Sequence, residues 1–98
     1  MEIIIKKTKR KDKKFEASAD GKTVRFGSTG YQDYTMHKDP ERKNRYIARH
    51  KNNEDWGKTG VMTAGYLSRF VLWNKPTIAS SIEDLDRKYR DIKFKYVA

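Results

Sequence analysis

The sequence contains no cysteine, only two histidines and two prolines, and no long apolar run. The absence of cysteine excludes disulfides, thiolate zinc sites and cysteine nucleophiles, and it suits a reducing compartment. The first apolar run, Ile3 to Ile5, is short, and no later run approaches the roughly twenty residues of a membrane span. We therefore expect a soluble protein without a signal peptide and without membrane contact.

Patterns typical of metal or catalytic sites are also scarce. His37 and His50 lie near Asp33 and Asp39 but lack the spacing of a metal site, and they are more typical of surface or hydrogen-bonded histidines. The GSTG segment at residues 27–30 lacks the further glycine of a dinucleotide fingerprint and the Gly-Lys-Ser/Thr of a P-loop. It is more typical of a turn that ends a strand.

One weak catalytic pattern remains near the end of the chain. Asp91-Ile92-Lys93 fits the acid-x-Lys half of a metal-dependent nuclease motif, in which Asp84 or Asp86 would supply the second carboxylate. The tripeptide is common, and Asp86 already has a basic residue four positions later. We expect no enzyme, no cofactor, no metal and no small-molecule substrate.

Positive charge is the most prominent feature that is present. The chain has 23 Lys and Arg against 13 Asp and Glu, a net charge of +10. Such a charge favours a polyanionic partner, which is nucleic acid, an acidic protein surface or anionic lipid. The densest segment, KKTKRKDKK at residues 6–14, fits either a solvated turn that protects a sheet edge or a loop that contacts phosphates.

The length and composition predict one α+β domain over residues 1–98. Twelve aromatic residues (2 Trp, 6 Tyr and 4 Phe) supply core area in a chain that is only 36% hydrophobic. We expect a small antiparallel β-sheet packed with about three short helices. Its strands are the N-terminal residues 2–8, a hairpin, and the alternating C-terminal residues 91–97.

The hairpin turns at Asp20-Gly21, a dipeptide that suits a type I′ turn. Folding the chain there pairs Phe15 with Phe26 on one face. On the opposite face it pairs Glu16 with Arg25 as a salt pair, and Ser18 with Thr23. A slip of one residue would spoil both faces, so the register should be well specified.

Helix signals follow in three places. Asp39 caps a helix that begins at Pro40 and runs to about Lys51, with three arginines on one face and Tyr46, Ile47 and His50 on the other. Thr63 caps a central core helix over residues 64–75. Ser80 and Glu83 form the capping box of the third helix, whose buried stripe is Ile82, Leu85 and Tyr89 and whose i,i+4 pairs are Glu83–Arg87, Asp84–Lys88 and Asp86–Arg90.

Aromatic and basic residues alternate through residues 26–56. Tyr31, Tyr34, Tyr46 and Trp56 resemble the stacking residues of single-stranded nucleic-acid sites, but so lean a domain needs its rings in the core, and we favour the core. The basic side chains are left for a polyanion or protein partner. The predicted partner-binding residues are Lys9, Arg10, Lys11, Lys13, Lys14, Lys38, Arg42, Arg45, Arg49 and Lys51.

Three motifs within residues 26–85 carry a resemblance. They are Gly30-Tyr31-x-Asp33-Tyr34, Arg45-Tyr46-x-x-Arg49-His50 and Leu72-Trp73-Asn74-Lys75-Pro76. The chain resembles a family of small uncharacterised basic proteins encoded by large DNA viruses of algae and protists. That resemblance implies no activity and no site residue, and it implies a location in the virion, the host cytoplasm or the virus factory.

Two functions follow from the charge and the resemblance. The first is a minor capsid or cement protein, whose partners are large viral capsid subunits or other virion proteins bound through the cationic face. The second is a sequence-independent nucleic-acid-binding protein that neutralises or packages viral DNA.

Overall fold

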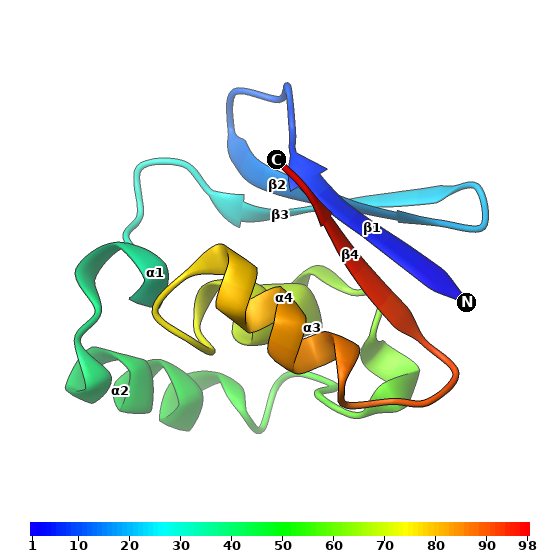
Figure 1. Cartoon of the computed structure of the whole chain (residues 1–98). Coiled ribbons are helices and arrows are strands. Elements are labelled where there is room, and N and C mark those ends of the chain that lie inside the picture. Colours follow the sequence, from blue (N-terminus) through cyan, green and yellow to red (C-terminus); the bar gives the residue numbers. More distant parts are fainter.

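A computed structural model describes all residues 1–98 and shows a four-stranded sheet with the helices on one of its faces (Figure 1). The α+β class is thereby confirmed. The strands are β1 (Glu2–Lys7), β2 (Lys13–Ala19), β3 (Lys22–Ser28) and β4 (Lys93–Val97). The helical elements are α1 (Tyr34–His37), α2 (Pro40–His50), η1 (Lys58–Gly60), α3 (Ala64–Leu67), η2 (Ser68–Leu72) and α4 (Ile78–Asp86).

The hairpin of β2 and β3 has the predicted register. Phe15 pairs with Phe26, and their rings stack with centroids 6.1 Å apart. Asp20 and Gly21 both take positive φ, 51° and 79°, as a type I′ turn requires. Glu16 lies opposite Arg25 as expected, but the two side chains form no ion pair.

The sheet is mixed, with strand order β3-β2-β1-β4, so the prediction of an antiparallel sheet is wrong at one pairing. β4 pairs with β1 in parallel, from Glu2 opposite Lys93 to Lys6 opposite Val97. The helices intervene between these strands and return the chain to the end of the sheet where β1 begins. A crossover of this kind is what a parallel pair needs.

Short helix α1 was not predicted. Asp33 caps it by accepting a hydrogen bond from the Thr35 N–H at 3.0 Å, and Lys38 closes it in the left-handed region with φ 55°. A single turn is too short to show apolar periodicity, so only the capping aspartate marked it. The next helix, α2, begins as predicted, with Asp39 as its cap and Pro40 in its first turn, and it ends at His50.

The central helix begins after its predicted cap, Thr63, but changes form midway. Residues 68–72 make a π-helical turn, closed by the Trp73 N–H donating to the Ser68 carbonyl at 3.1 Å, and the helix ends there rather than at Lys75. The extra residue in this turn changes the face on which the following side chains lie. Leu72 is buried in the core, whereas Trp73 lies against α2.

The third helix, α4, starts three residues before the predicted position. Its cap is Thr77, whose hydroxyl accepts from the Ser80 N–H at 3.1 Å while the Ser80 hydroxyl accepts from the Thr77 N–H at 3.3 Å. Ser80 is therefore the third residue of a capping box and not its cap. The earlier start buries Ser81, which accepts a hydrogen bond from the Lys75 N–H at 2.9 Å.

Only one of the three predicted pairs along α4 forms, between Glu83 and Arg87 at 3.1 Å. The other two predicted pairs, Asp84–Lys88 and Asp86–Arg90, are absent because the helix ends at Asp86. Asp84 accepts from the Asn74 side chain and Asp86 accepts from the Phe94 N–H, each at 2.9 Å. These two carboxylates therefore connect α4 to the loop after η2 and to β4.

The core lies between the sheet and the helices. Its members come from all four strands, from residues 61–72, from α4 and from Ile92. Ile3, Phe26, Tyr66 and Leu85 are among its fully buried side chains. No helix in the structure combines the length and the apolar character that crossing a membrane requires.

Candidate functional site

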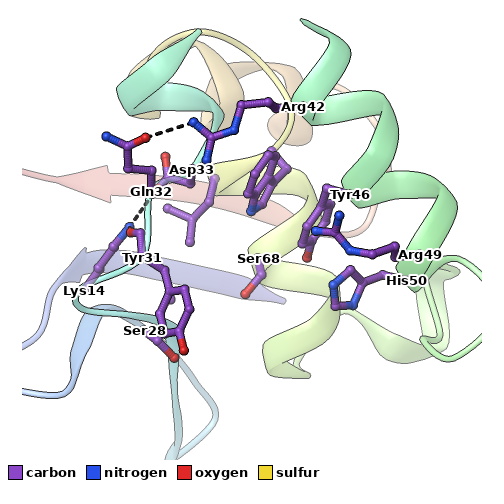
Figure 2. A pocket seen from close by; sticks show the side chains of 13 residues that line it. Lys14, Ser28, Tyr31, Gln32, Asp33, Arg42, Tyr46, Arg49, His50 and Ser68 are labelled. Carbon is purple, nitrogen blue, oxygen red and sulfur yellow. Dashed lines mark hydrogen bonds and ion pairs between the residues drawn. The ribbon is translucent and has the colours of Figure 1, made fainter. Parts of the chain in front are cut away.

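A cleft of about 580 Å³ opens between the hairpin and α2 (Figure 2). One wall is formed by β2, the end of β3 and the loop that leads to α1. The other wall is formed by α2, with η2 and Trp73 beneath it. Three cationic side chains, Lys14, Arg42 and Arg49, and one acidic side chain, Asp33, line the cleft. Segments distant in sequence thus form one hollow with a positive balance of charge.

Aromatic rings form the floor of the cleft on the α2 side. Tyr46 stacks on Trp73 with ring centroids 4.3 Å apart and an interplanar angle of 3°. His50 also stacks on Tyr46, with ring centroids 4.4 Å apart. The His37 ring lies tilted against the indole ring of Trp73, with ring centroids 5.3 Å apart. Burial raises the pKa of Tyr46 to about 12. Tyr46, Trp73 and His50 thus form an aromatic lining on this side of the cleft.

Lys14 supports the opposite wall. Its ammonium donates to the Asp33 carboxylate at 2.7 Å and also to the Tyr31 carbonyl. The Lys14 side chain is 16% exposed and that of Asp33 only 4%. Lys14 was predicted to bind a partner, but Asp33 already neutralises it, so we assign it to holding the loop after β3 in place.

The arginines of α2 divide between the cleft and the outer surface. Arg42 donates to the Gln32 side chain at 2.9 Å across the mouth of the cleft, and Arg49 lines the cleft without an ion pair (Figure 2). Arg45, predicted to share their face, lies outside the cleft and reaches Glu41 only at 4.0 Å. Two of the three arginines therefore face the hollow.

The turn between β1 and β2 and the first residue of β2 carry the second group of predicted cations. Lys9, Lys11 and Lys13 form no ion pair, whereas Arg10 pairs with Asp12 through two hydrogen bonds of 3.0 and 3.2 Å. The Thr29 hydroxyl donates to the carbonyl of Lys11 at 2.8 Å. The turn is thus pinned to the end of β3, next to the cleft. In Figure 1 it lies on the opposite side of the molecule from α2.

Two predicted cations lie outside the cleft lining at the ends of the helices. Lys38 is the left-handed residue after α1, and its ammonium donates to the Thr35 carbonyl at 3.0 Å. Lys51 is the exposed residue that follows α2. Both lie in the same part of the chain as Arg42 and Arg49 but are not brought into the hollow.

Three basic residues with internal contacts were not anticipated. Lys43 donates to the Asn74 carbonyl at 2.7 Å, Arg69 donates to the Trp73 carbonyl at 2.8 Å, and Lys88 lies over the Phe70 ring at 3.6 Å. Burial lowers the pKa of each. Lys43 and Arg69 fix the backbone at the end of η2 and so position the indole in the cleft floor.

Sequence patterns identified some of the cleft residues and missed others. The prediction that the aromatic side chains belong to the core is right for Tyr46, and Tyr34 and Trp56 are half-buried. Tyr31, in contrast, is 74% exposed at the mouth of the cleft. Gln32 and Trp73 were not predicted to belong to a site. Their positions depend on the capping of α1, for which Asp33 is the only sequence signal, and on the π-helical turn, which has none.

No group of three or more His, Asp or Glu side chains is arranged to hold a metal ion. His37 and His50 lie at opposite ends of the aromatic stack, because Tyr46 and Trp73 separate them. Of the carboxylates in the weak nuclease pattern, Asp91 accepts a hydrogen bond from Lys58 at 2.7 Å, while Asp84 and Asp86 accept from Asn74 and from the Phe94 N–H.

The environment of His37 predicts that the stability of this region depends on pH. Its Nδ1 accepts a hydrogen bond from the Asp39 N–H at 3.0 Å, which requires a neutral ring. Burial lowers the pKa of His37 below its ordinary value of 6.5, Arg42 adds to the shift, and Asp39 and Asp33 oppose it. Since the folded state holds the proton less tightly than the unfolded state, protonation favours unfolding.

We therefore expect the free energy of unfolding to fall as pH decreases from about 7 to about 5. The variant His37→Asn keeps an acceptor near the Asp39 N–H but cannot titrate, so its stability should change less over that interval. Urea unfolding at both pH values measures the difference. An equal loss in the two proteins would show that His37 is not the responsible group.

The fold and the cleft define a small basic α+β protein with cationic side chains around a cleft that is lined on one side by aromatic rings. Residues 3–50 match the model of a family of unknown function, DUF5754. The matched part runs from Ile3 in β1 to the end of α2, so it includes both cationic groups and both walls of the cleft, but not η2 or Trp73 beneath them. No curated protein and no solved structure matches the chain.

The match supports the coarser part of the resemblance, a family without an assigned function. It does not identify a source, so the viral origin stays a prediction.

Proposed function

We propose that this protein is a non-enzymatic nucleic-acid-binding protein that contacts the phosphate backbone without reading base sequence. One observation carries the proposal: Arg42 and Arg49 line the same cleft as Tyr31, an aromatic side chain that is 74% exposed. Cations that follow a backbone beside rings on which bases stack are the combination used by sequence-tolerant nucleic-acid sites.

The free cations extend this surface beyond the cleft. Lys9, Lys11 and Lys13 form no ion pair, and they adjoin the end of β3 that borders the cleft. The turn is held at the end of β3, and Ser28 at that end and α2 both line the cleft, so a polymer that touched the turn and α2 would cross the cleft. The arrangement favours a long polyanion over a small anionic ligand.

A virion cement protein is the alternative that the resemblance leaves open. Stable protein interfaces have an apolar centre. The exposed large apolar side chains here are Met1, Tyr31, Met36 and Val97, and the first and last lie at opposite ends of the β1–β4 pair. This distribution favours nucleic acid as the partner. In the viral setting that the resemblance implies, the bound molecule would be the packaged genome.

Salt dependence tests the proposal. If the five unpaired cations, Lys9, Lys11, Lys13, Arg42 and Arg49, each contact one phosphate, the slope of log K against log salt concentration should be about −3.5 on a single strand. Fluorescence anisotropy with labelled oligonucleotides of unrelated sequence measures it, and the sequences should agree within a few-fold. Absence of binding at low salt, or a flat slope, would overturn the proposal.

A further inference from the structure

Tyr31 is the most exposed large apolar residue of the protein, at 74%, and its ring stacks on no other ring. It stands at the mouth of the cleft (Figure 2). The face of an aromatic ring in this position is exposed to solvent. Such a face is available to stack on a ligand.

The backbone beneath this ring is firmly held. Lys14 binds the Tyr31 carbonyl, Asp33 is held by the same ammonium, and Thr29 is tied to the basic turn by its N–H and its hydroxyl. Gly30 takes the positive φ of 87° that the bend requires. A ring on a fixed backbone loses little conformational entropy when a ligand covers it.

The charges that surround this ring suit a nucleotide. Arg42 and Arg49 lie across the cleft, in reach of a backbone phosphate that enters beside α2 (Figure 2). The one carboxylate in the lining, Asp33, is 4% exposed and paired with Lys14, so it presents no free negative charge to the ligand. The hollow of about 580 Å³ lies in the range of roughly 300–1,000 Å³ that is typical of small-ligand sites.

We infer that the cleft accepts an unstacked base against Tyr31, so that the protein prefers single-stranded to duplex nucleic acid. This inference rests on the proposed function and specifies its substrate class. A base in a duplex is stacked on both faces and cannot reach a ring in a cleft without leaving the helix. Stacking accepts any base, which agrees with binding that does not depend on sequence.

The test compares three ligands of equal length, about twelve nucleotides. They are oligothymidylate, the corresponding duplex, and an abasic strand that keeps every phosphate but has no bases. We expect oligothymidylate to bind about tenfold more tightly than either of the others. Oligouridylate, in a parallel titration, distinguishes RNA from DNA as the source of the strand.

The matched variants are Tyr31→Ala and Tyr31→Phe. Tyr31→Ala should weaken oligothymidylate binding about tenfold, leave the abasic strand unaffected and keep the salt slope, whereas Tyr31→Phe should bind as the wild type does. Circular dichroism should show both variants folded, because the ring is exposed.

Equal affinity of Tyr31→Ala and wild type for oligothymidylate, or equal affinity of the wild type for the strand, the duplex and the abasic strand, would overturn the inference alone. Failure of all the ligands to bind would instead overturn the proposed function.

Discussion

The double variant Arg42→Glu/Arg49→Glu is expected to bind oligonucleotides at least about a hundredfold more weakly than the wild type at moderate salt. Under the proposed function, the variant would lose two phosphate contacts and would place two negative charges in the cleft where the phosphates would lie. Fluorescence anisotropy at a single salt concentration measures the loss.

The fold should survive this change. Arg42 makes only a surface hydrogen bond to Gln32, and Arg49 forms no ion pair. A glutamate in the first turn of α2 suits the helix dipole, whereas one in the last turn opposes it, so the two effects largely cancel. The thermal midpoint should therefore stay close to that of the wild type.

The matched control is Arg45→Glu/Lys51→Glu. It changes the net charge by the same amount and in the same helical region, but neither residue lines the cleft. We expect it to weaken binding by about tenfold or less, through the general field of the protein. If the two double variants lost affinity equally, binding would depend on overall charge and not on the cleft.

Lys14→Met should lower the free energy of unfolding by about 3 kcal/mol. The change leaves the Asp33 carboxylate, only 4% exposed, without its counter-ion, and it releases the Tyr31 carbonyl. Removing one member of a buried ion pair costs more than the pair contributes, because an uncompensated charge remains. Urea denaturation gives the difference directly.

Two further variants define the cause of that loss. Lys11→Met removes an exposed lysine with no ion pair and should change stability by less than about 0.5 kcal/mol. Lys14→Met/Asp33→Asn should recover much of the lost stability, because the asparagine oxygen can still cap α1 while the unpaired charge is gone. A Lys14→Met variant as stable as Lys11→Met would show that the pair does not support the loop.

Local features of the fold could be predicted because neighbouring residues decide them. The hairpin register depends on Asp20-Gly21 and on the match of Phe15 with Phe26, and all of these lie within one short segment. The start of α2 depends on Asp39 and Pro40 in the same way.

The start of α4 could not be chosen from such signals. Thr77 and Ser80 are both good caps, and each has a suitable partner three residues later. Starting at Thr77 buries Ser81, whose hydroxyl bonds the backbone at Lys75, and this contact is outside the helix itself. Tertiary packing therefore decided between two local solutions of similar quality.

The sequence by itself determined the positive charge, the α+β class, the hairpin and the stripe of arginines on α2. Only the tertiary structure decided which of those cations share a cleft. Lys14 meets Asp33 across the chain, and Tyr46 meets Trp73 because a π-helical turn redirects the indole. Contacts between distant segments depend on how the helices pack on the sheet, and no local pattern of residues encodes that packing.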